Sequence, residues 1–360
     1  MTATLPPIST IMVDDPAAAG SNDAETIAGY AAVREHFGIS AFDSLGKLRV
    51  RGEAARDLLD VVLTGTLRHA PENTIRASLA LREDGRILTD VAVYCGFDDY
   101  LVLAEQDALP ALHAALEARA DDAVEIEDLT DALGVVRVDG PSAADLPRRL
   151  IGPEAAGLRL MTSVACAWGG EVLTIGRIGS AGEYGYQFLG PRPVVAEIAA
   201  RARDQNPKSA ACAGGVYDLL FLEMRNFNRR RDLPRDEPPL AAGLHWMIDF
   251  RKPEFVGREA LLVSKAHLVQ RMVCVRLAAG APVPGTGDPV SIDGRPCGYI
   301  ANAAYSPGLR LPIALAYVDA PLALVGVPLT VTTRDGGAPG ATVSAPFLRT
   351  RSNSPQSVGG

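Results

Sequence analysis

The residues of this chain that could take part in chemistry are carboxylates, arginines and aromatic residues, because its cysteines and histidines are dispersed. The five cysteines include no Cys-x-x-Cys pair, and the five histidines are equally scattered. Metal sites are usually built from closely spaced ligands of these types. We therefore expect no metal site, and the odd number of unpatterned cysteines indicates reduced, mostly buried thiols.

Two other groups of residues each allow two interpretations. The run Arg229–Arg231 could pair with an anionic tail of a ligand, or it could be a solvated loop, which is the commoner role of such a run. Trp246 could be a core aromatic or the wall of a binding site. His245 beside it is interpreted as a structural histidine rather than a catalytic base.

Composition indicates a globular protein without a nucleic-acid or membrane partner. The chain has 360 residues, of which 48% are hydrophobic and 22% charged, and its net charge is −8. An acidic balance offers no basic face to nucleic acid or to anionic lipid. No window approaches the roughly 18 apolar residues of a membrane span, and residues 1–20 lack the regions of a secretory signal. We therefore expect a cytoplasmic protein.

Alternating strand and helix patterns predict two similar α+β domains after a flexible arm over residues 1–26. In the domain over residues 27–120, a hairpin turn is expected at Asp84-Gly85, and the later helix places three leucines on one face. Residues 121–205 repeat the mixed pattern, and we extend this second domain to residue 267. Within it, residues 238–261 are expected to form a turn, a half-buried strand and a helix beginning near Arg258.

The pattern changes from about residue 268. Short strand signals alternate there with Gly, Pro and Asp turns, and helical periodicity is absent. Residues 268–348 therefore predict a separate all-β domain, a small barrel. The polar residues 349–360 predict a disordered tail.

Four motifs together resemble those of the glycine cleavage T-protein (aminomethyltransferase) family, and the resemblance covers residues 27–348. They are the hairpin Gly85–Asp90, the glycine-rich turn Gly179–Tyr186, the helix Tyr217–Glu223 and the segment Pro238–Leu261. The resemblance implies a three-domain cloverleaf, in which two α+β domains and a C-terminal β-barrel surround a central folate channel. It also implies that the cofactor is tetrahydrofolate, or a 5-substituted or methylene derivative of it.

By this resemblance, Asp90 is the catalytic carboxylate and Glu183 grips the pterin ring. Asp90 falls on the second Asp of the family's hairpin motif, whereas the first falls on Thr89. A carboxylate near folate N5 and N10 could orient the cofactor and handle protons. A carboxylate can also accept the two adjacent N–H groups of a pterin edge. The alternatives are a turn or cap carboxylate for Asp90 and a solvated turn residue for Glu183.

Other residues are expected around the cofactor. Apolar and aromatic walls would enclose a pterin ring, although the aromatic candidates could equally be plain core residues. Besides Glu183, the expected cofactor-binding residues are Tyr94, Leu101, Leu103, Trp246, Arg225 and Ser180.

The chain departs from the family pattern around the second substrate. Tyr217 and Phe221 stand where the family helix carries arginines, and Arg225, one turn further on, could substitute for one of them. Ser180 replaces a tyrosine, and Ala165-Cys166 replaces an aromatic pair. These changes indicate an altered pocket and a partner other than the aminomethyl-lipoyl protein.

The sequence therefore predicts a tetrahydrofolate-dependent one-carbon transferase. Folate N5 would give or receive a methyl, methylene or hydroxymethyl unit, and the other substrate would be a small molecule. One alternative is the aminomethyltransferase of the glycine cleavage system. The other is a non-catalytic folate-binding protein of the iron–sulfur maintenance type, although its Lys-Gly-Cys loop is absent and the nearest cysteine is Cys212. A lipoyl carrier protein is not expected as a partner, and the chain is expected to be a monomer or a weak homo-oligomer.

Overall fold

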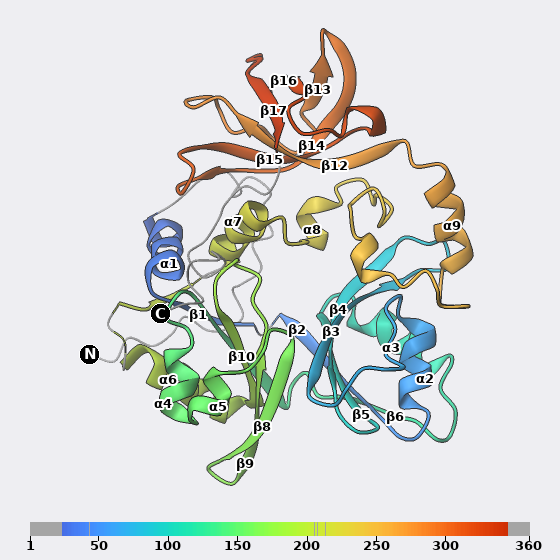
Figure 1. Cartoon of the computed structure of the whole chain (residues 1–360), viewed down its shortest axis with the longest axis vertical. Coiled ribbons are helices and arrows are strands. Elements are labelled where there is room, and N and C mark those ends of the chain that lie inside the picture. Colours follow the sequence, from blue (N-terminus) through green and yellow to red (C-terminus); the bar gives the residue numbers. More distant parts are fainter. Residues whose placement is uncertain (1–23, 43, 205, 207, 213, 345–360) are drawn as a thin grey trace.

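The computed structural model describes residues 24–42, 44–204, 206, 208–212 and 214–344. Figure 1 shows two α+β halves below a barrel, with helices α7 (Gly214–Met224) and α8 (Arg229–Asp232) between them and the barrel. Residues 24–26 of the expected arm begin a helix. The rest of that arm and the expected tail lie outside the described residues.

One 11-stranded sheet runs through both halves in the order β11-β1-β7-β10-β9-β8-β3-β4-β5-β2-β6. The halves join where β8 meets β3, through a single register pair, Thr74 with Thr162. The strands of the first half are β2 (Leu45–Arg51), β3 (Thr74–Leu81), β4 (Ile87–Cys95), β5 (Asp99–Glu105) and β6 (Glu125–Asp128). Those of the second half are β1 (Gly38–Ala41), β7 (Leu133–Asp139), β8 (Thr162–Trp168), β9 (Glu171–Arg177), β10 (Gly185–Pro191) and β11 (Ala210–Ala211).

The halves exchange strands across the expected domain boundary at residues 120 and 121. Strand β1 pairs with β7 and β11 of the second half, although it precedes the first half in sequence. Strand β6 comes after the boundary and pairs with β2 of the first half. Each half is therefore completed by a strand that the chain supplies from the other side of that boundary.

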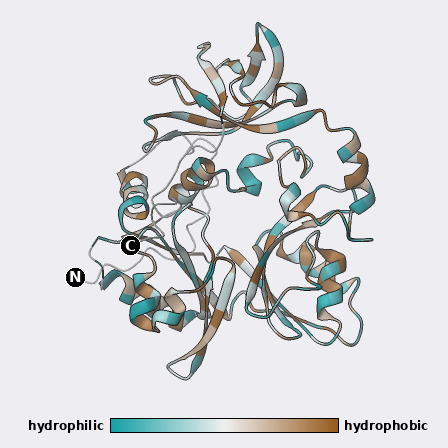
Figure 2. Ribbon diagram, in the orientation of Figure 1, coloured by the Kyte–Doolittle hydropathy of each residue, from teal (hydrophilic) through white to brown (hydrophobic). Residues whose placement is uncertain are grey.

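Helices cover the outer faces of the sheet, because each presents one apolar stripe to the strands. The predicted leucines Leu109, Leu112 and Leu116 of α3 are buried against β2–β5 together with α2. A second core lies between the second half and α4 and α6. Both hydrophobic and hydrophilic residues appear on these surface helices in Figure 2. The helices of the two halves are α1 (Ala24–Glu35), α2 (Ala55–Val62), α3 (Leu109–Glu117), α4 (Asp145–Leu150), α5 (Pro153–Ala156) and α6 (Arg192–Asp204).

The C-terminal domain is a closed barrel in the order β12-β15-β14-β13-β16-β17, with β17 pairing back to β12. This confirms the predicted all-β domain; the last strand had no sequence prediction. The barrel comprises β12 (Gln270–Leu277), β13 (Pro289–Ile292), β14 (Arg295–Ser306), β15 (Leu311–Asp319), the short helix η4 (Ala320–Leu322), β16 (Pro328–Val331) and β17 (Gly340–Ser344).

The half-buried strand predicted within residues 238–261 is wrong. The segment forms turns and a 3₁₀ helix, η3 (His245–Met247), before α9 (Arg258–Ala266) begins as predicted. Its hydrogen bonds are local: the Leu244 N–H donates to the Pro239 carbonyl at 3.0 Å, and the Met247 N–H to the Leu244 carbonyl at 3.0 Å. Gly243, with a φ of 79°, turns the chain in a way that an extended strand does not allow.

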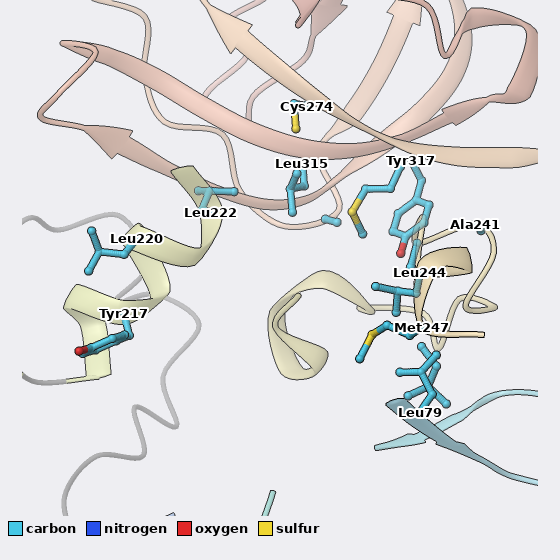
Figure 3. Close-up of a cluster of buried hydrophobic side chains, with 14 of the residues drawn as sticks. Leu79, Tyr217, Leu220, Leu222, Ala241, Leu244, Met247, Cys274, Leu315 and Tyr317 are labelled. Atoms are coloured by element: carbon cyan, nitrogen blue, oxygen red, sulfur yellow. The ribbon is translucent and has the colours of Figure 1, made fainter. Parts of the chain in front are cut away.

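A large central core holds the three parts together. It contains side chains of α7, of residues 240–248 and of the barrel strands β12, β14 and β15. Figure 3 shows Leu222 of α7 close to Leu315 and Cys274 of the barrel, and Leu244 and Met247 between Tyr317 and Leu79. Each large apolar side chain that is fully buried contributes roughly 1.5–3 kcal/mol, so this core fixes the barrel on the two halves.

Candidate active site

Strand alternation places four of the expected site residues on one face of the first half. In β4, Val91 and Val93 point into the core beneath α2 and α3. Since successive side chains of a strand point to opposite faces, Asp90 and Tyr94 point to the other face. Leu101 and Leu103 of β5 do the same. We call this the inner face, because it turns towards the second half.

An inner cluster joins the two halves at this face. Tyr94 and Leu103 are buried against Val135 of β7 and Leu189 of β10, and Leu101 packs against them. The Tyr94 hydroxyl donates a 2.8 Å hydrogen bond to Gln187 Oε1 of β10. Burial raises the pKa of Tyr94 above its ordinary value, so it is a neutral donor at physiological pH.

Asp90 lies on the same face. Its side chain is partly buried, and its carboxyl binds a proton more tightly than an ordinary aspartate does. Burial, and then the negative charge of Glu105, raise the pKa of its carboxyl to about 6. Within the part of the chain that the structure describes, its carboxylate makes no side-chain hydrogen bond or ion pair. A carboxyl group with a pKa near 6 can exchange a proton near neutral pH, as general acid–base catalysis requires.

Glu183 is held in a buried ionic cluster. It is 7% exposed, and its Oε1 lies 3.2 Å from Arg34 Nη1 of α1. Arg34 Nη2 lies 2.6 Å from Glu223 Oε2 of α7, and Glu223 Oε1 accepts hydrogen bonds from Tyr30 at 2.9 Å and Ser306 at 2.6 Å. Glu183 is therefore not a solvated turn residue. Sequence reasoning missed Arg34, because 149 residues separate it from Glu183 and no local pattern links them.

A second missed cluster lies on β7, on the face opposite Val136 and Val138. Arg137 Nε lies 2.8 Å from Asp139 Oδ2, and the Tyr217 hydroxyl donates to the same oxygen at 2.7 Å. The Arg137 guanidinium also lies 5.5 Å from the ring centroids of Phe42 and Tyr217. A guanidinium thus contacts Tyr217, the residue that stands where the family helix carries an arginine. The sequence did contain a signal for this cluster, because Arg137 and Asp139 are polar residues at alternate positions of an otherwise apolar strand.

The structure places Trp246 and Arg225 outside the inner cluster. Both line a cavity of about 290 Å³ beside the barrel, and Trp246 is 65% exposed. Arg225 Nη2 donates to the Met272 carbonyl of β12 at 3.0 Å, which ties α7 to the barrel. Ser180 stays in the turn that carries Glu183, and its carbonyl accepts from Asn226 Nδ2. His245 is exposed in η3.

The arginine run is engaged within the protein. Arg229 Nε donates to Glu105 Oε2 at 2.7 Å, and its Nη2 lies 2.7 Å from Asp107 Oδ2. Arg230 lies within 3.5 Å of the same two carboxylates. Arg231 pairs with Asp218 on α7 at 2.6 Å. The run is therefore part of the wall between α8 and the first half rather than a solvated loop.

Asp232 gives the protein a pH-dependent stability. Its side chain is buried, and it accepts hydrogen bonds from Asn302 Nδ2 at 3.0 Å and from the Asn228 N–H at 2.9 Å. Burial raises its pKa from 3.8 to about 7. Because the folded-state value is the higher one, its stabilising contribution is complete below about pH 4 and is lost as the pH rises through 7.

We expect Asp232→Asn to remove this pH dependence. Relative to the wild type, the unfolding free energy of the variant should rise between pH 4 and pH 8 by up to about 4 kcal/mol, from the shift of about 3 units. Urea unfolding at several pH values measures it. Asp293→Asn, which changes an exposed carboxylate of the barrel, should follow the wild type. Parallel pH curves for the wild type and Asp232→Asn would contradict the assignment.

Three further observations complete the description of the site and its surroundings. No three His, Cys, Asp or Glu side chains come together to hold a metal ion among the described residues. The five cysteines are free thiols, four of them buried. No helix in the described part of the chain is long and apolar enough to cross a membrane.

Comparison with known proteins connects this geometry to a family. The family model described as the GCVT N-terminal domain matches residues 19–252, and the glycine cleavage T-protein C-terminal barrel domain matches residues 270–348. An aminomethyltransferase of Streptomyces avermitilis is 32% identical over 329 residues, with 88% of each chain covered. That of Frankia alni is 30% identical over 328 residues, covering 89% of this chain and 88% of the relative.

The fold has a counterpart among solved structures. The crystal structure of the glycine cleavage system aminomethyltransferase T from Bartonella henselae matches with a TM-score of 0.80 at 21% identity. The match covers 91% of this chain and 90% of that one. The predicted cloverleaf of two α+β domains and a β-barrel is thus confirmed, and the chain belongs to the glycine cleavage T-protein family.

Proposed function

We propose that this protein is a tetrahydrofolate-dependent aminomethyltransferase of the glycine-cleavage type. Its relatives are named aminomethyltransferases over nearly the whole chain, which favours this alternative over a general one-carbon transferase acting on a small molecule. The observation that carries the proposal is Asp90. Asp90, which the resemblance assigns as the catalytic carboxylate, points to the inner face, and its carboxyl has a pKa of about 6.

The proposal takes the inner face as the pterin site. Tyr94, Leu101 and Leu103, which pack together there, would provide the apolar wall that ligand sites usually have. Glu183 provides a buried carboxylate, which has about four acceptor sites, so its contact with Arg34 does not prevent it from also accepting pterin N–H groups. Tetrahydrofolate, when bound, would supply N5 and N10 as carbon acceptors, and their two protons would leave with the ammonia and the carrier thiol.

The residues of the chain have distinct parts in this proposal. Glu183 would anchor the pterin, and the inner cluster would hold its face. Asp90 would hold or release a proton at its carboxylate oxygens while it orients the reacting nitrogen. Proximity alone lowers the barrier of such a transfer considerably. The expected cytoplasmic location and the monomeric or weakly oligomeric state remain predictions.

Binding of tetrahydrofolate tests the proposal. Isothermal titration should show stoichiometric binding to the wild type, weakened about tenfold or more in Glu183→Gln, because loss of one charged hydrogen bond costs roughly 1.5–3 kcal/mol. Glu127→Gln, which neutralises an exposed carboxylate of β6, should bind like the wild type. Thermal unfolding of both variants checks that they are folded. The absence of tetrahydrofolate binding to a folded wild-type protein would refute the proposal.

A small-molecule donor is the second candidate. It is favoured by Tyr217 and Phe221, which stand at the family's arginine positions, and by the contact of Tyr217 with Arg137 and Asp139. Formation of a one-carbon derivative of tetrahydrofolate, measured with each donor in turn, distinguishes the two. Turnover with an aminomethyl-lipoyl carrier supports the glycine-cleavage reaction. Turnover only with small N-methyl or N-aminomethyl compounds supports this second candidate.

A further inference from the structure

We propose that Glu105 and Arg229 are positioning residues for Asp90, and that their ion pair decides whether Asp90 holds a proton when the substrates bind. This inference rests on the proposed function, because it concerns the same carboxylate. It gives a role to Glu105 and to Arg229 of the arginine run. The sequence did not reveal that either residue lies beside Asp90.

The strand register places Glu105 opposite Asp90. Val91 of β4 pairs with Ala104 of β5, so the next positions along the two antiparallel strands bring Asp90 and Glu105 together. Both are on the inner face, since Val91 and Ala104 are in the core beneath α2 and α3. Opposite side chains of such a pair have Cβ atoms about 5 Å apart, and like charges there repel each other.

The arrangement restores a second carboxylate to the site. The family motif has two adjacent Asp residues, the first of which is Thr89 here. Thr89 is fully buried and, as the strand neighbour of Asp90, points to the opposite face. Glu105 reaches the inner face from the neighbouring strand and is thus the acidic partner of Asp90 in this chain.

Arg229 forms an ion pair with that partner. Its Nε contacts Glu105 Oε2 at 2.7 Å, and its Nη2 contacts Asp107. Arg230 adds a second guanidinium, 3.5 Å from Glu105 and 3.2 Å from Asp107. Two arginines of α8 therefore balance two carboxylates, one at the end of β5 and one just after it, whereas Asp90 stays outside these pairs.

The electrostatic consequences have opposite signs. Glu105 favours the protonated form of Asp90, and Arg229 favours the ionised form. A movement of α8, or a charged substrate that draws Arg229 and Arg230 away from Glu105, would leave Asp90 beside an unpaired carboxylate. Asp90 would then take up a proton more readily. Of these residues, Arg229 and Asp107 line a cavity of about 270 Å³, so a ligand there would meet the arginine of the pair and not Glu105.

Two substitutions with opposite expected effects test the proposal. Glu105→Gln should move the protonation midpoint of Asp90 down by roughly one pH unit, and Arg229→Gln should move it up by a similar amount. The midpoint is read from the carboxyl ¹³C signal of labelled aspartate, assigned by its loss in Asp90→Asn, in the protein without substrates. The acidic limb of kcat/KM against pH should move in the same directions.

The matched control is Asp99→Asn. Asp99 is at the other end of β5 and forms an Arg–carboxylate pair with Arg49, so its loss should leave the Asp90 midpoint unchanged. Midpoints within about 0.2 unit of the wild type in both Glu105→Gln and Arg229→Gln would overturn the inference. Shifted midpoints in a protein that does not bind tetrahydrofolate would instead keep this inference and reject the proposed function.

Discussion

Replacement of Asp90 by alanine should lower kcat/KM for transfer of the carbon unit by about 10²–10⁴-fold, the usual contribution of a positioned general acid or base. Binding of tetrahydrofolate should change little, because Glu183 and the inner cluster remain. The wild-type rate should fall as the pH drops through about 6, the pKa of the Asp90 carboxyl. Ammonia release measured between pH 5 and 8 tests both expectations.

Controls separate this role from a structural one. Asp90→Asn keeps the shape of the side chain but does not titrate, so it should lose the acidic limb of the pH profile as well as the rate. Asp57→Asn changes an exposed carboxylate of α2 on the outer face of the same half, and it should behave like the wild type. An Asp90→Ala variant with wild-type activity would remove the catalytic assignment.

The sequence predicted best what depends on local periodicity. The turn at Asp84-Gly85, the leucines of α3 and the short strands of the barrel are local patterns, and the structure has all of them. By contrast, residues 238–261 lack a dominant period, and the positive φ of Gly243 and local turn hydrogen bonds replace the predicted strand.

Long-range contacts limited the prediction of the site. Nothing near Arg34 indicates that it would contact a carboxylate of a turn far along the chain, and nothing near Glu105 indicates an arginine of α8 as its partner. Trp246 illustrates the same limit for apolar residues. A tryptophan is suited both to a protein core and to the wall of a binding site. The sequence could not show that residues 240–248 pack against the barrel in a way that leaves Trp246 65% exposed.

The largest expected effect on stability comes from Arg34→Met. Arg34 is the guanidinium between Glu183 and Glu223, whose side chains are 2% and 0% exposed. Its removal leaves two buried carboxylates without their shared cation. We expect the unfolding free energy at pH 8 to fall by roughly 3–5 kcal/mol, the usual cost of removing one partner of a buried ion pair.

The pH dependence of this loss identifies its cause. The loss comes from uncompensated negative charge, which burial penalises and which is smaller at low pH than at high pH. The difference between Arg34→Met and the wild type should therefore be smaller at pH 5 than at pH 8 in urea unfolding. Arg49→Met removes a partly exposed pair with Asp99, at 36% and 41%, and should cost less than about 1 kcal/mol. A loss that is equal at both pH values would mean that lost packing of the Arg34 side chain, rather than uncompensated charge, weakens the fold.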